Sequence, residues 1–382
     1  MRVFIFFAVL FLSVLSGSDK GGAQMSGAVL PPDLQSPTES VVQLAQRLTP
    51  EERRQRRNAR QGRRQQAGER VGDRGGGAAG QVALPASGTI RATLLGTGGG
   101  PGGGGPGLLT QRMNSTVLVE AADQVLLFDV GRGTVIRLAQ MGQRYFQAID
   151  KVFITHLHSD HVTDLPDLFL SGPNLGRRGD LKVWGPTGTA GLVDHVKRAF
   201  AWDLNYRTNP RRGRPEMIAE EVVEGVIYEG SGVKVTVFQV DHWPPRESEA
   251  SRDRFPAVGY RVDYNGRSVA ISGDTRFSRN LVKFAKGANV VIHEVHVGLG
   301  LRGTMGPRDR QRGSHHSSPQ DVGRVFKETG TKLGVFYHIV FGRSSEEDLL
   351  RLARETYDGP MKVGKELMQI VIGDEVSVTE RN

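Results

Sequence analysis

Apolar and polar residues alternate in several short segments after about residue 89, which is the pattern of half-buried β-strands. Three such segments follow one another before the first clear helical pattern, so the sequence predicts a sheet-rich α/β domain over residues 89–382. Asn265-Gly266 between two alternating segments predicts a tight hairpin turn. The predicted strands cover residues 89–95, 114–120, 125–129, 151–154, 181–184, 233–238, 259–263, 268–271 and 333–337, and the predicted helices cover 133–141 and 319–328, with others starting at 165 and 344.

The first 18 residues have the pattern of an export signal. An apolar run from Val3 to Leu15 follows Arg2; it is too short to span a bilayer comfortably but has the length of a signal-peptide core. The small residues at 16–18 predict cleavage before Asp19, so residues 1–18 would be a signal peptide and the mature protein secreted or periplasmic. An uncleaved anchor helix is the alternative.

Residues 19–88 differ in composition from the rest of the chain. They are dominated by Arg, Gln, Gly and Ala and contain no aromatic residue, and seven arginines lie between Arg53 and Arg64. With 11 Lys/Arg against 7 Asp/Glu, this segment carries nearly half of the formal net charge of +9. Because no apolar face is present, the sequence predicts a basic, low-complexity, disordered linker. A basic arm that binds nucleic acid or an anionic surface is the alternative.

Two compositional features exclude classes of site. The chain contains no cysteine, so disulfides, thiolate zinc sites, cysteine nucleophiles and the lipid anchor of bacterial lipoproteins are excluded. The glycine-rich segment 96–107 follows a predicted strand, as in dinucleotide sites, but it leads into another strand and not into a helix. We therefore expect no nucleotide site there and interpret the segment as a flexible loop at the rim of a pocket.

Four potential metal ligands lie within six residues after the predicted strand 151–154. They are His156, His158, Asp160 and His161, and imidazole nitrogens with carboxylates are the ligands that zinc prefers when no thiolate is present. An extended turn after the strand would let the first two histidines converge on one ion, while Asp160 and His161 reach a second. The spacing therefore predicts a hydrolytic site with two metal ions.

The motif, together with one earlier and three later segments, resembles the signature of the metallo-β-lactamase superfamily. The matching segments contain Asp129, His242, Asp274 in Ser-Gly-Asp-Thr, and His338. The resemblance implies a four-layer αββα sandwich and two Zn²⁺ ions, with Mn²⁺ or Fe as alternatives. It places His156, His158 and His242 on one ion, and Asp160, His161 and His338 on the other. Asp274 would bridge the ions, a hydroxide would lie between them, and Thr155 and Asp129 would orient the ligands.

Two further motifs resemble the ribonuclease Z and arylsulfatase-like branch of this superfamily. Glu294 lies in a His-Glu pair, and His316 lies in a His-Ser-Ser segment. The resemblance implies that His316 protonates the leaving group and that Glu294 orients it, with His315 as the alternative acid. Asp160 is predicted to be catalytic as well as a metal ligand.

The spacing of the motifs indicates which class of substrate to expect. Ribonuclease Z enzymes that process tRNA carry a long arm between the motifs of His242 and Asp274, but only 32 positions separate these residues here. Together with the export signal, this favours an exported di-zinc hydrolase of small anionic esters, arylsulfatase-like, which uses the bridging hydroxide. A phosphodiesterase or ribonuclease Z-like nuclease is the first alternative, although nucleic acid is not the expected partner. A non-catalytic, metal-stabilised binding protein is the second, and a homodimer is compatible with the resemblance.

Overall fold

A computed structural model describes residues 84–101, 111–208, 216–244, 247, 249–300 and 315–380. Residues Ala79–Asn382 form one compact unit. The predicted signal peptide and almost all of the predicted linker lie outside the described residues and stay predictions. No helix in the described part of the chain is both long and apolar enough to cross a membrane.

The first of two β-sheets contains eight strands, and it changes from antiparallel to parallel pairing at β3. The pairs from β15 to β3 are antiparallel, whereas β3, β4, β5 and β6 are parallel neighbours. In spatial order the strands are β15 (Val376–Thr379), β14 (Gln369–Ile372), β1 (Ile90–Gly96), β2 (Thr116–Ala121), β3 (Gln124–Phe128), β4 (Lys151–Phe153), β5 (Leu181–Gly185) and β6 (Met217–Glu221).

The second sheet has seven strands and repeats this change. Strands β7 to β10 pair antiparallel, and β10 to β13 pair parallel. The predicted Asn265-Gly266 turn joins β9 to β10, and both of its residues have positive φ, as such a turn requires. The spatial order is β13 (Met361–Val363), β12 (Leu333–Val340), β11 (Val290–His296), β10 (Arg267–Ile271), β9 (Val258–Tyr264), β8 (Val233–Gln239) and β7 (Gly225–Gly230).

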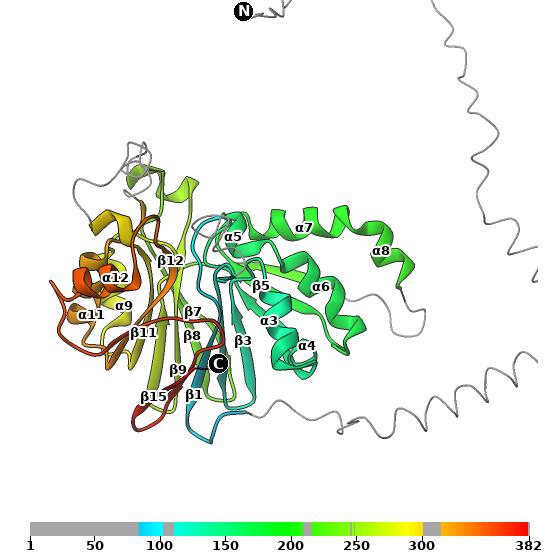
Figure 1. Cartoon of the computed structure of the whole chain (residues 1–382). Coiled ribbons are helices and arrows are strands. Elements are labelled where there is room, and N and C mark those ends of the chain that lie inside the picture. Colours follow the sequence, from blue (N-terminus) through cyan, green and yellow to red (C-terminus); the bar gives the residue numbers. More distant parts are fainter. Residues whose placement is uncertain are drawn as a thin grey trace, which may run out of the picture. The chain divides into compact units, whose positions relative to one another are not determined.

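The two sheets pack face to face, and helices cover their outer faces (Figure 1). One apolar cluster joins side chains from both sheets, and two others join each sheet to its helices. The four-layer αββα sandwich is therefore confirmed. Helices α3 (Thr134–Met141), α4 (Arg144–Ala148), α6 (Leu165–Asn174), α7 (Thr189–Ala199) and α8 (Ala201–Tyr206) cover the first sheet, and α9 (Arg279–Ala285), α11 (Pro319–Thr329) and α12 (Glu346–Ala353) cover the second.

Tyr260 ties the two sheets together beneath the histidine motif. Its ring on β9 lies 5.4 Å from the ring of Phe128 and 5.8 Å from that of Phe153, measured between centroids. Its buried hydroxyl donates to the carbonyl of Ile154 at 2.6 Å. A buried carbonyl that loses its partner costs about 1–3 kcal/mol. This contact therefore holds the end of β4, from which the motif emerges, against the second sheet.

The glycine-rich segment lies between β1 and β2, and no helix begins in its described residues 96–101. Its residue Gly98 forms bridges to Asn114 and to Ile339. Its first residues therefore lie beside the end of β12, while residues 102–110 lie outside the described part.

The expected elements are present, but one predicted strand is longer than expected and several strands were not predicted. The predicted strand 333–337 extends to Val340, so His338 lies within β12 and not after it. The residues Val290–His296, first noticed for their His-Glu pair, form a fully buried central strand. Strands β6, β7, β13, β14 and β15 were not predicted. All of them except β14 are edge strands, and short or half-exposed edge strands give a weak pattern of apolar and polar residues.

Candidate metal centre

The histidine motif changes backbone conformation halfway along its length. His158 has extended backbone angles (φ −66°, ψ 147°) and caps the N-terminus of α5 (Ser159–Val162). His156 and His158 therefore lie in the predicted extended turn, whereas Asp160 and His161 lie in the first helical turn. Because of this change of direction, four potential ligands that are close together in the sequence can point towards two different ion positions.

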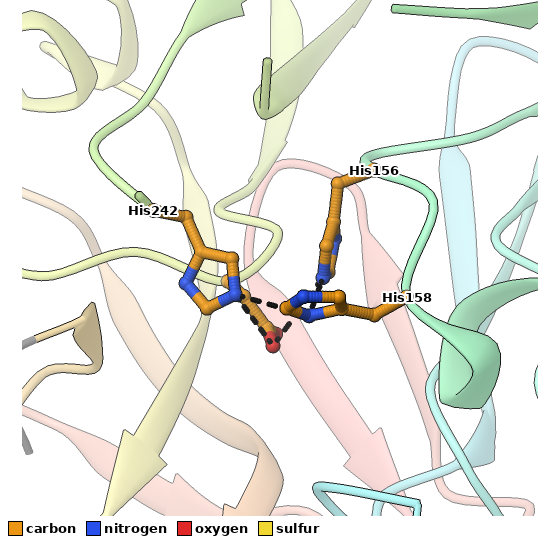
Figure 2. A group of neighbouring side chains, drawn as sticks. His156, His158 and His242 are labelled. Atoms are coloured by element: carbon orange, nitrogen blue, oxygen red, sulfur yellow. Dashed lines mark hydrogen bonds and ion pairs between the residues drawn. The ribbon is translucent and has the colours of Figure 1, made fainter. Parts of the chain in front are cut away.

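His156, His158 and His242 converge on one point (Figure 2). Nε2 of His156 lies 2.9 Å from Nδ1 of His158, and Nε2 of His242 lies 3.3 Å from the same atom. Nδ1 of His242 donates to the carbonyl of His315 at 2.8 Å, so Nε2 of the neutral ring offers its lone pair to the site. Three imidazole nitrogens around one point fit a divalent metal ion.

The second group consists of Asp160, His161 and His338, all of them buried. Nε2 of His338 lies 3.1 Å from Oδ2 of Asp160. Nε2 of His161 lies 3.6 Å from the same oxygen. Among the described residues, Nε2 of His161 is a fully buried atom without a hydrogen-bond partner. A buried, unpaired ligand atom of this kind is what an ion site needs.

Asp274 lies between the two groups, and its two oxygens face different ones. Oδ2 lies 3.7 Å from Nε2 of His156 and 3.8 Å from Nε2 of His242. Oδ1 lies 3.4 Å from Nε2 of His161 and 3.2 Å from Nδ1 of His338. Oδ1 is itself buried without a hydrogen-bond donor. This single carboxylate can therefore contact an ion on each side.

Asp129 orients the second group through a short network. Its Oδ2 accepts from Nδ1 of His161 at 2.7 Å and from the hydroxyl of Thr155 at 2.9 Å, and its Oδ1 accepts from the Thr155 amide at 2.8 Å. Because Nδ1 of His161 is engaged, only Nε2 can serve as a ligand. The two residues expected to orient ligands are therefore in contact with them. Asp129 has φ 58°, a left-handed conformation that aspartate tolerates better than most residues.

A β-bulge directs His338 into the site. In the pairing of β11 with β12, Glu294 lies opposite Tyr337 but Val295 lies opposite Ile339, so His338 is the extra residue. Its backbone is left-handed at this point, with a φ of 43°. The sequence could not place this bulge, because the apolar pattern of β12 continues through it.

The electrostatics of the cluster differ between its members. Burial lowers the pKa of His156 and of His242 well below the usual value, so both rings are neutral and able to bind a metal. Burial alone would raise the pKa of Asp274, but the histidines around it lower that pKa well below its usual value. Burial also opposes protonation of His161, yet the surrounding carboxylates, led by Asp274, raise its pKa well above the ordinary value.

Glu294 and His316 are brought together beside this cluster. Oε1 of the fully buried Glu294 accepts from the amide of Ser317 at 2.9 Å, the amide of Thr275 at 3.2 Å and Nδ1 of His316 at 3.3 Å. Nδ1 of His316 lies 4.0 Å from Oδ2 of Asp274. Burial would lower the pKa of His316, but Glu294 and then Asp274 raise it to about 9.

Comparisons with known proteins decide the family. The sequence model described as beta-lactamase superfamily domain matches residues 126–339. Ribonuclease Z of Mycolicibacterium gilvum is 31% identical over 277 residues, which cover 69% of this chain and 91% of that protein. The chain belongs to the metallo-β-lactamase superfamily. The predicted enzyme class, a metal-dependent hydrolase of ester bonds, is confirmed with it.

Solved structures of this superfamily share the fold. The metallo-β-lactamase fold protein YhfI from Bacillus subtilis aligns with a TM-score of 0.54 at 17% identity, covering 74% of this chain and 99% of its own. The short form of human tRNase Z aligns with a TM-score of 0.51 at 23% identity, again covering 74% and 99%. At these identities the agreement establishes the fold alone.

The superfamily implies a divalent metal, and the described residues fit one. Their donors are the nitrogen and oxygen atoms that zinc, manganese and iron accept, and the ligand atoms of each group lie within 4.8 Å of one another. The buried, unpaired atoms of His161 and Asp274 point to the same conclusion. All seven predicted metal ligands come together, as does the pair Glu294 and His316.

Sequence reasoning missed residues that shape this superfamily site from a distance. Glu366 contacts both flanks of the glycine-rich segment, and Leu157 and Phe255 line a cavity beside the first histidine group. Leu157 could have been suspected, because it lies between two ligands. Glu366 and Phe255 belong to no recognisable motif, so only the tertiary structure reveals them.

Proposed function

We propose that the chain is a two-zinc phosphodiesterase of the ribonuclease Z type that acts on RNA. The observation that carries this proposal is the position of Asp274, which presents one oxygen to each of two ligand groups. Two bound zinc ions would lower the pKa of a water molecule towards neutrality and would stabilise the negative charge that develops at phosphorus. The remaining steps depend on the residues of the chain itself.

The distances between ligand atoms assign each group of residues to one of the two ions. His156, His158 and His242 would hold the first ion, and their neutral rings are ready to bind. The second ion would be held by the buried ligands of the other group, namely Asp160, His161 and His338. Asp274 would contact both. Asp129 and Thr155 would keep His161 in the one orientation that turns Nε2 inward.

His316 is the residue best placed to protonate the leaving oxygen. Glu294 binds its Nδ1, which leaves Nε2 as the nitrogen that can donate. When the P–O bond breaks, the departing oxygen would take that proton, and Glu294 would stabilise the positive charge of the ring before transfer. A positioned acid of this kind contributes about 10²–10⁴-fold to a rate.

The relatives support the phosphodiester alternative more than the arylsulfatase hypothesis. The alignment with the M. gilvum ribonuclease Z takes 277 residues, 69% of this chain and 91% of that protein. It leaves no room for a long insertion in the relative that this chain lacks. The short span between His242 and Asp274 therefore does not separate this chain from proteins named ribonuclease Z and does not favour a sulfate ester.

Turnover of three substrates by zinc-loaded protein tests the proposal. We expect hydrolysis of bis(4-nitrophenyl) phosphate and cleavage of a single-stranded RNA, with 4-nitrophenyl sulfate turned over at least about 100-fold more slowly. The variant Asp274→Ala should lose both bound zincs, and His158→Ala should lose one, as measured by metal analysis. Faster turnover of the sulfate ester, or fewer than one zinc per chain in the unmodified protein, would contradict the proposal.

A further inference from the structure

A cavity of about 530 Å³ opens beside the first histidine group. His156, His158 and His242 form one side of it, whereas none of the three ligands of the second group lines it. Its volume lies within the range of about 300–1,000 Å³ that small-molecule sites take. A substrate whose phosphodiester lies at the ion positions would therefore extend one of its substituents into this space.

The walls away from the histidines are mainly apolar. Leu157 forms one of them, and it is 37% exposed, between the buried ligand His156 and the exposed ligand His158. It packs against Gly188, where a β-carbon would lie 2.7 Å from Leu157 Cδ1. Pro244, Phe255 and Pro256 contribute further carbon surface. An exposed leucine beside a metal centre fits contact with an apolar or planar group.

The wall that contains Phe255 is fixed to the metal motif through the backbone. The amide of Val258 donates to the carbonyl of Thr155 at 2.9 Å, and the amide of Val240 donates to the carbonyl of Ala257 at 3.0 Å. Phe255 itself closes the 3₁₀ helix Glu249–Arg254 with a hydrogen bond to Ser251. The backbone that carries this ring is therefore hydrogen-bonded to the strand end that precedes His156, as the support of a stacking surface should be.

The same walls offer few cationic or N–H groups that could bind an anion other than the scissile phosphodiester. The N-terminus of α7 faces the cavity at Gly188, but the carboxylate of Glu221 already accepts from the amides of Gly188 and Ala190 at 2.7 and 3.2 Å. Arg254 is the one Lys or Arg among the described lining residues. It pairs with Glu247 at 3.4 Å and lies 4.8 Å over the ring of Phe255. The cavity therefore suits a neutral, planar substituent.

We infer that the cavity binds one nucleobase of the substrate, stacked at Phe255, with the scissile phosphodiester at the histidine groups. This inference rests on the proposed phosphodiesterase function and adds a subsite for one base beside the scissile bond. Stacking of a base on an aromatic ring is sequence-tolerant, because every base has a π-face. The ring edge of the base would meet Leu157 and the prolines.

Two substrates with the same leaving group test this inference. Thymidine 5′-(4-nitrophenyl phosphate) contains a base, and methyl 4-nitrophenyl phosphate does not. We expect zinc-loaded protein to prefer the thymidine ester by about 10-fold or more in kcat/KM. Phe255→Ala should remove most of this preference through a higher KM, while kcat/KM for the methyl ester changes less than about twofold.

Two further variants separate stacking from packing or folding. Phe255→Leu keeps the apolar volume but not the ring, so it should lose the base preference with an unchanged zinc content. Trp202→Ala removes an aromatic ring that is 76% exposed on α8, outside the cavity lining, and should keep the full preference.

The outcomes of this experiment distinguish the two proposals. No turnover of either ester would overturn the phosphodiesterase function. Turnover of both esters at equal kcat/KM, or an equal loss for both in Phe255→Ala, would overturn the nucleobase subsite alone.

Discussion

The carboxylate of Glu366 accepts two hydrogen bonds from Thr97, one from the amide and one from the hydroxyl, both at 3.0 Å. The same oxygen accepts from the amide of Met113 at 3.0 Å. Thr97 lies at the start of the glycine-rich segment and Met113 lies shortly after its end, so one half-buried carboxylate binds the backbone on both sides of the segment. The amide of Ile339, next to the ligand His338, donates to the carbonyl of Thr97 at 2.8 Å. Glu366 thus supports the backbone that carries a metal ligand.

We expect Glu366→Gln to lower kcat/KM for a phosphodiester by about 10-fold while the zinc content stays unchanged. The amide group would turn an N–H towards Nε of Arg137, which now donates to Glu366 Oε2 at 3.1 Å. Hydrogen bonds to a charged group contribute about 1.5–3 kcal/mol each. Steady-state kinetics and metal analysis measure the effect.

Glu120→Gln is the matched control for this substitution. Glu120 is likewise a carboxylate paired with an arginine, Arg91, and it is buried on β2 away from the ligands. We expect a lower melting temperature without a change in kcat/KM. An equal loss of activity in both variants would show that Glu366 acts through general stability only.

Metal binding should release protons, mainly from His161. Its pKa in the metal-free protein is raised well above the ordinary value by Asp274 and the other carboxylates, so at neutral pH a proton occupies the cluster. A metal must displace that proton, and zinc affinity should therefore fall as the pH falls. Titration calorimetry in two buffers of different ionisation enthalpy measures the number of protons released. A buffer-independent heat would contradict this prediction.

The role of His316 can be separated from that of its neighbours by the leaving group. We expect His316→Gln to lower kcat by about 10²-fold or more for RNA, whose alkoxide leaving group needs a proton. The loss should be small for bis(4-nitrophenyl) phosphate, because 4-nitrophenolate leaves unprotonated. Glu294→Gln should show the same selectivity in a weaker form, since Glu294 holds Nδ1 of His316.

His315 provides the comparison for this assignment. It lines the cavity and accepts from His242 through its backbone carbonyl. We expect His315→Gln to affect both substrates by a similar factor. If instead His315→Gln showed the leaving-group selectivity and His316→Gln did not, the proton donor would be His315.

Export remains a prediction of the N-terminal sequence. The apolar run Val3–Leu15 and the small residues that follow it predict a mature protein that begins at Asp19. Intact mass of the protein recovered from the periplasm or the medium measures the cleavage site. A full-length chain retained in the cytosol or the membrane would contradict this prediction.

Much of the fold and most of the candidate site could be predicted from local sequence pattern. The strands near the centre of each sheet have a clear apolar pattern. The pattern is continuous where both faces of the strand are buried and alternating where one face is buried. The edge strands β6 and β7 were missed since partial exposure weakens that pattern. The bulge at His338 was missed because its cause is the pairing of β12 with β11, which no local pattern encodes.

The sequence by itself determined the chemistry of this protein. Histidines and aspartates at fixed spacings after strands specify which atoms can bind metal, since spacing and residue type are local properties. Only the tertiary structure decided how these atoms are divided between two ion positions and which residues hold them in place. Residues far apart in the chain meet in four places. These are the contacts of the two Asp274 oxygens, the hydrogen bond between Asp129 and His161, the hydrogen bonds of Glu366 and the cavity at Phe255. Such contacts arise from the pairing of strands within each sheet and from the packing of the two sheets, which both depend on the whole domain.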